Sequence, residues 1–202
     1  MAAGAVRLQW PALWAAAHTP APTGLRGILG GTTTRRAEVD PGNLEDPSTE
    51  LERLADEQLD ANDAEGADAG GSAARARRCD RVLALYAAGA VDSRADAYHA
   101  ACVLLYSTEA AHIDLAATLA RGAARRGEDR AWPIIAAAVD RAHLARGQRQ
   151  RFGTQFVRQG KRWVVAPVDP AVSDALRAFY AVPPLWVLHQ SAAQLQRDDE
   201  RA

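Results

Sequence analysis

Neutral hydrogen-bonding side chains are concentrated in one short stretch, Gly147 to Phe156, with the sequence GQRQRFGTQF. Amide and hydroxyl groups both donate and accept hydrogen bonds, so they can hold a polar ligand or tie a loop to its neighbours. The sequence leaves both alternatives open. Together with candidates elsewhere in the chain, the residues predicted to form a binding site are His112, Asp140, Arg141, Gln148, Gln150, Phe152, Gly153, Thr154, Gln155 and Arg177.

Two residues have side chains suited to general acid/base chemistry. They are His112, in the stretch AAHIDLAA, and Asp140. In such an enzyme Arg141 or Arg177 would hold an anionic substrate. Asp140 and His143, three residues apart on a helix, are a second possible acid/base pair, although a surface ion pair is the more ordinary use of that spacing. No catalytic residue is therefore assigned from the sequence.

The sequence offers no signature for a metal or a cofactor. None of the five histidines pairs with another at the i,i+4 spacing of a zinc protease helix, and no phosphate-binding glycine loop is present. The only cysteines, Cys79 and Cys102, exclude a disulfide framework. We therefore expect no metal and no cofactor, and a reducing, cytoplasmic location. Because no run of about 18 apolar residues occurs, we also expect no membrane segment.

Charge is unevenly distributed along the chain. Residues 1–68 carry 5 Lys/Arg against 12 Asp/Glu, and the remainder carries 19 against 13. From Arg141 to Arg162 there are seven basic residues and no acidic one, interleaved with Phe152, Phe156 and Trp163. Cations with aromatic rings are what single-stranded nucleic acid binding requires, so nucleic-acid binding is a further alternative. A solvated basic face is the default interpretation.

The pattern of apolar residues predicts a mainly α-helical fold. Residues 1–74 are predicted to be a largely disordered arm with one short acidic helix, STELERLADEQLDAND. Residues 75–190 are predicted to form a compact antiparallel helical domain, with a capping box at Ser93 and Asp96 and with glycine ends at Gly89, Gly127 and Gly147. A β-hairpin follows, whose two-residue Gly160–Lys161 turn sets Phe156 opposite Val165 and Arg158 opposite Trp163. The next predicted element is a helix capped by Asp169. Residues 191–202 are predicted to be a polar tail.

The central stretch resembles a bacterial family of unknown function. Its members share an Asp-Arg pair near a helix end, then Gly, then Gln-x-(Tyr or Phe)-Gly-Thr-Gln. Here these are Asp140, Arg141, Gly147, Gln150, Phe152, Gly153, Thr154 and Gln155. The resemblance spans about residues 80–186 and includes AAHIDLAA, Arg177 and VPPL. It implies a shared site but no reaction, and Phe152 here makes a hydroxyl-dependent role at that position doubtful.

These observations favour a ligand-binding or protein-interaction module whose polar pocket lies where the helix ending at Gly147 meets the hairpin. The partner, a small molecule or a protein, is not identified by the sequence. An enzyme using His112 or Asp140 as acid/base is the first alternative, and nucleic-acid binding through residues 141–162 is the second. Convergence of His112, Asp140 and Gln155 around a concave pocket would favour the enzyme.

Overall fold

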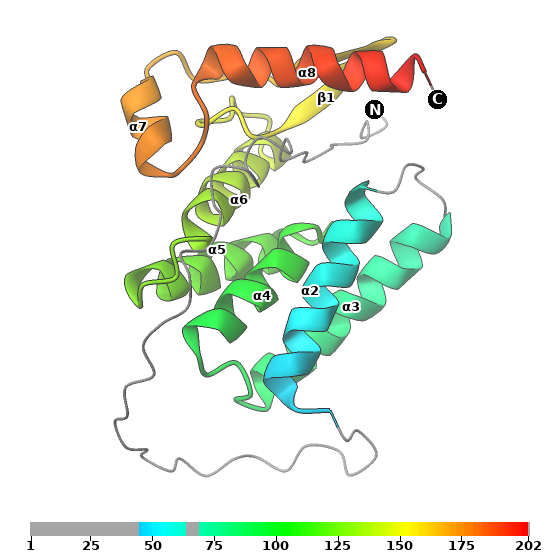
Figure 1. Cartoon of the computed structure of the whole chain (residues 1–202), viewed down its shortest axis with the longest axis vertical. Coiled ribbons are helices and arrows are strands. Elements are labelled where there is room, and N and C mark those ends of the chain that lie inside the picture. Colours follow the sequence, from blue (N-terminus) through cyan, green and yellow to red (C-terminus); the bar gives the residue numbers. More distant parts are fainter. Residues whose placement is uncertain (1–44, 64–68, 202) are drawn as a thin grey trace, which may run out of the picture.

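The computed structural model describes residues 45–63 and 69–201. The predicted disorder of residues 1–44 falls outside the described residues. Within them the fold is mainly helical with one two-stranded antiparallel hairpin, as predicted (Figure 1). The elements are α2 (Pro47–Asp63), α3 (Ala69–Ala87), α4 (Arg94–Leu105), α5 (Ala110–Arg125), α6 (Ala131–Ala145), β1 (Phe156–Gln159), β2 (Arg162–Val165), α7 (Asp174–Phe179) and α8 (Leu185–Asp199).

Helices α2 to α6 share the larger of two hydrophobic cores. On α5 the buried residues recur at helical spacing from Ile113 to Ala124, and most of them are alanines. Alanine lets helix axes approach closely, so α4, α5 and α6 pack tightly against one another. No helix in residues 45–63 or 69–201 is long and apolar enough to span a membrane.

The ends of these helices follow the sequence closely. Ser93 and Asp96 form the predicted capping box at the start of α4, with each side chain bonded to the backbone of the other. Gly89, Gly127 and Gly147 follow α3, α5 and α6 with φ between 70° and 86°. These left-handed conformations suit glycine, so the predicted helix ends are confirmed.

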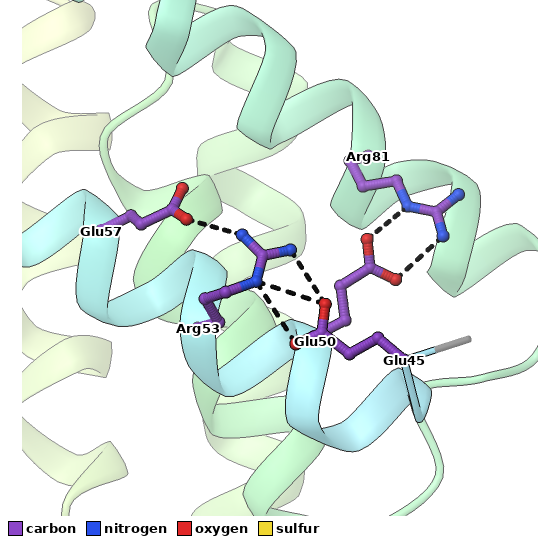
Figure 2. Close-up of polar contacts among 5 residues, drawn as sticks. All are labelled: Glu45, Glu50, Arg53, Glu57 and Arg81. Atoms are coloured by element: carbon purple, nitrogen blue, oxygen red, sulfur yellow. Dashed lines mark hydrogen bonds and ion pairs between the residues drawn. The ribbon is translucent and has the colours of Figure 1, made fainter. Parts of the chain in front are cut away.

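Helix α2 belongs to the helical body, which corrects the predicted domain start at residue 75. Leu51 and Leu54 are buried in the larger core. Figure 2 shows the polar contacts along the helix: Glu50 makes a two-pronged ion pair with Arg81 of α3, at 2.7 and 2.8 Å, and Arg53 bonds Glu45 and Glu57. The leucines lie on one face of this acidic helix, and that face packs on the helical body.

The hairpin has the predicted register, with Phe156 opposite Val165 and Arg158 opposite Trp163. Its inward side chains Phe156, Trp163 and Val165 lie in the smaller core with α6, α7 and α8. Figure 1 shows α6 running from the helical body to the hairpin, and α8 lying across the end of the molecule beside the strands. Helix α6 therefore connects the two cores.

Two predictions at the C-terminal end were wrong. The helix expected from Asp169 begins at Asp174, because Ser173 is the residue that caps it. The predicted polar tail is the second half of α8, where Ala192 and Leu195 are buried against the hairpin core. A helix with a narrow apolar stripe among glutamines and charges was mistaken for a solvated tail.

Candidate functional site

Asp140, near the end of α6, is fully buried, and its carboxylate is surrounded by donors from the following loop. Its Oδ1 accepts the backbone N–H groups of Arg151 and Phe152 at 2.7 and 2.9 Å. Its Oδ2 accepts the N–H and the hydroxyl of Thr154 at 2.9 and 2.7 Å. One side chain thus fixes four donors of the segment that connects α6 to the hairpin.

The electrostatics of Asp140 combine opposing effects. Loss of hydration raises the pKa of the carboxyl, while the donors from Phe152, Thr154 and Arg151 act to lower it. The pKa is raised overall, so burial has the larger effect. The carboxylate organises the loop, because its four described hydrogen bonds all come from residues 151–154.

Gln150 and Gln155 extend this network beneath the hairpin, and both are fully buried. The Gln150 amide nitrogen donates to the carbonyls of Gln155 and Ala166 at 3.0 and 2.8 Å, and its oxygen accepts the Gln155 N–H at 2.9 Å. The Gln155 amide nitrogen donates to the Thr154 hydroxyl. Only the Gln155 Oε1 has no hydrogen-bond partner in this network.

Arg177 of α7 also bonds this loop. Its Nε donates to the Phe152 carbonyl and its Nη1 to the Val172 carbonyl, both at 2.9 Å, and Nη1 also meets Asp174. Arg177 is almost fully buried, so its guanidinium bonds groups inside the protein. We name the loop and its holders, Asp140, Gln150, Thr154, Gln155 and Arg177, the junction network.

The predicted site residues therefore separate into two groups. The junction network has the geometry of a latch between helices and hairpin, and Phe152 and Gly153 are buried with it. Gln148 is exposed, and its backbone N–H bonds the His143 carbonyl. His112 and Arg141 lie elsewhere, at Ser107, so His112 does not converge with Asp140 and Gln155.

A second polar group lies where α4 ends and α5 begins. Ser107 Oγ is 2.8 Å from His112 Nδ1, and it accepts the Glu109 N–H at 3.1 Å. Arg141 of α6 donates from Nη2 to the Ser107 carbonyl at 2.9 Å. Loss of hydration lowers the pKa of Arg141, and the positive charge of Arg75 on α3 adds to this shift. We call Arg75, Ser107, His112 and Arg141 the arginine cluster.

The arginine cluster has a surplus of positive charge. Loss of hydration is the main cause that lowers the pKa of Arg141. Neither Arg75 nor Arg141 has a carboxylate partner among the described residues, and the buried Arg75 Nε has no hydrogen-bond partner there. The start of α5 adds the positive end of a helix dipole next to Ser107. An anion placed here would offset charges that have no carboxylate partner in residues 45–63 and 69–201.

Sequence reasoning missed Arg75 and Ser107. Arg75 lies in a run of arginines that looks like a solvated helix face, and Ser107 lies in a short connection between helices. The spacing of Ser107 and His112 could have predicted their contact. A hydroxyl just before a helix and a histidine in the first turn of that helix are brought together by the turn.

Other candidates have ordinary structural partners. His143 Nδ1 is paired with the Arg149 carbonyl at 3.2 Å, and Asp140 is used by the loop, so the structure brings no acid/base pair together from these two. Burial raises the pKa of the Cys102 thiol to about 12, which suits a packing residue. No group of His, Cys, Asp and Glu with metal-binding geometry occurs in the part of the chain that the structure describes.

Comparison with known proteins finds no family model, no curated protein and no solved structure that matches this chain. The resemblance built on Asp140, Arg141 and GQRQRFGTQF therefore stays a prediction.

Proposed function

We propose that this protein is a binding module for a small anionic molecule, held by the arginine cluster. The observation that carries the proposal is the partly buried Arg141, which bonds the Ser107 carbonyl beside His112 and has no carboxylate partner among the described residues. Removing charge from water is costly unless a counter-charge is present. A carboxylate or phosphate group would supply that charge.

The neighbouring groups suit recognition of such an anion. A guanidinium offers several N–H donors in a fixed plane, and Arg141 uses only Nη2 for a described hydrogen bond, to the Ser107 carbonyl. The Ser107 hydroxyl and the His112 ring lie at the same corner and add neutral polar groups. The proposal thus keeps a polar ligand site at His112 and Arg141 and assigns the junction network to holding the fold.

The test is a thermal-shift and calorimetry series with inorganic phosphate, glucose 6-phosphate, malate and uncharged glucose. At least one anion should bind and raise Tm, while glucose should not. Arg141→Met should abolish the shift and Arg75→Met should weaken it. Arg77→Met, which removes an exposed arginine from the same helix, is the matched control and should bind as wild type does.

The stability of the ligand-free variants supplies a second measurement. Because a poorly hydrated charge without a counter-ion is itself costly, Arg141→Met should leave the free energy of unfolding within about 1 kcal/mol of wild type or raise it. A folded Arg141→Met protein that still binds the anion as wild type does, or a wild type that binds none of the anions, would contradict the proposal.

A second candidate function is an enzyme in which His112 is a general base for Ser107. The specific observation is the 2.8 Å contact of Ser107 Oγ with His112 Nδ1. Because Oγ accepts the Glu109 N–H, its own proton is available to an unprotonated Nδ1. A fluorophosphonate probe should then label Ser107, and His112→Gln should prevent labelling. An unlabelled wild type would remove this candidate.

A further inference from the structure

An open groove of about 630 Å³ lies between β2 and α8, away from both polar groups described above. Its lining includes Lys161, Arg162 and Val164 from the hairpin side and Ala192, Ala193 and Arg197 from α8. That volume is in the range of small-molecule sites, which is about 300–1,000 Å³. The groove combines a floor of small apolar side chains with cationic walls.

The two walls are held together by specific contacts. The Trp163 backbone N–H donates to Gln196 Oε1 at 3.0 Å, and its indole N–H donates to Asp199 at 2.8 Å. Arg158 also pairs with Asp199. The strand and helix are therefore joined at their edges, so the groove exists without a ligand and binding would not have to open it.

Charge in the groove is not balanced by the described residues. Lys161 and Arg162 are exposed and form no ion pair in the described part of the chain, and Arg197 bonds only the Gln194 amide oxygen. Glu200 is the one carboxylate in the lining, and it accepts a hydrogen bond from Gln196. Three cations thus face one partly engaged acid, and His189 of α8 is a further titratable residue in the lining.

We propose that this groove binds a small amphipathic anion, such as a medium-chain fatty acid. The apolar body would lie on Val164, Ala192 and Ala193, and the acid group would lie among the cations. A nucleic acid fits less well, because Trp163 is only 6% exposed and Arg158 Cζ lies over its ring at 5.1 Å from the centroid, which leaves no open surface for base stacking.

Titration calorimetry of the full chain with decanoate tests the assignment, and decanol serves as the uncharged probe with the same apolar body. Decanoate should bind at least about tenfold more tightly than decanol, since the charge contributes on the order of 1.4 kcal/mol or more. Arg162→Gln and Arg197→Gln should each weaken decanoate binding several-fold. Ala193→Glu, which adds a carboxylate to the floor, should abolish it.

Matched controls separate this site from the arginine cluster. Arg149→Gln removes an exposed cation outside the groove, and Arg141→Met removes the proposed anion site, so both should bind decanoate as wild type does. The proposal would be overturned by no binding of decanoate, by equal binding of decanol, or by unchanged binding in Ala193→Glu. Tighter binding of a short single-stranded oligonucleotide through Arg162 and Arg197 would overturn it in favour of nucleic acid.

Discussion

Asp140 and Arg141 are neighbours in the sequence with opposite roles in the structure. The Asp140 carboxylate is surrounded by donors that the fold itself supplies, whereas Arg141 is partly removed from water and has no described acid beside it. Satisfied buried charge holds a loop in place, and uncompensated charge is available to a ligand. The side chains of adjacent helical residues point in different directions, which is why one pair can serve both purposes.

Removing the Asp140 side chain should be among the most damaging single changes in the protein. Asp140→Ala leaves three backbone N–H groups and the Thr154 hydroxyl without their acceptor, so we expect a loss of about 3–5 kcal/mol in the free energy of unfolding. Urea denaturation of the purified variant measures this loss.

The matched control for Asp140 is Asp114→Ala on α5. Asp114 is exposed and its only described ion pair is a 3.8 Å contact with Arg146, so its removal should cost within about 0.5 kcal/mol. Similar costs for the two alanine variants would mean that the loop is not held by Asp140.

At the scale of elements, the loop before the hairpin packs directly on α8. Gly153 has φ of +91°, and a Cβ there would approach Leu188 Cδ1 to 2.9 Å and Leu185 Cδ1 to 3.3 Å. Glycine is therefore required twice, by backbone conformation and by close approach. Gly153 thus lets the loop before the hairpin lie directly against α8.

Gly153→Ala should destabilise the protein by more than the conformational penalty alone, about 2–3 kcal/mol in all. Gly160→Ala is the control, since Gly160 also has positive φ but nothing within 4 Å of a Cβ, and it should cost about 1 kcal/mol. The difference between the two, measured by urea unfolding, reports the contact with α8. Equal costs would show that the leucines move aside freely.

The sequence allowed most elements to be predicted but not all of their surroundings. Capping residues and glycines specify helix ends locally, and the two-residue turn specifies the hairpin register, so these predictions were confirmed. Burial of α2 and α8 depends on which partner covers a narrow apolar stripe, and that is decided by tertiary packing. For the same reason the sequence identified the polar side chains of GQRQRFGTQF but not the acceptor and donor that each one faces.

At the scale of the whole molecule, α6 connects the two hydrophobic cores. Val139 packs against both cores, and Ala136, one turn of the helix earlier, belongs to the core of the hairpin and α8. Because a loss of packing in one core would disturb a helix that the other needs, we expect the described body to unfold as one cooperative unit. A perturbation buried in the larger core should then lower the stability of the whole protein.

His99 on α4 provides such a perturbation through pH. Its ring is largely buried in the helical body, and Nδ1 has no hydrogen-bond partner among the described residues. Burial, followed by the charge of Arg130, lowers the pKa of His99 below its ordinary 6.5. The carboxylates that act against this shift are Glu52, Asp56 and Asp96.

The sign of the effect follows from proton binding. Below about pH 6.5 the unfolded chain binds a proton at His99 that the folded protein does not bind. The free energy of unfolding therefore falls as the pH is lowered from 7 towards 5. This histidine contributes at most about 1.4 kcal/mol per pH unit to that fall. Urea unfolding followed by circular dichroism at several pH values should show this slope. His99→Asn should reduce this slope, and His189→Asn, which changes an exposed histidine on α8, should retain it.

If His99→Asn keeps the full wild-type slope, acid sensitivity arises elsewhere. If the hairpin tryptophan signal and the helical signal change at different urea concentrations, α6 does not couple the two cores.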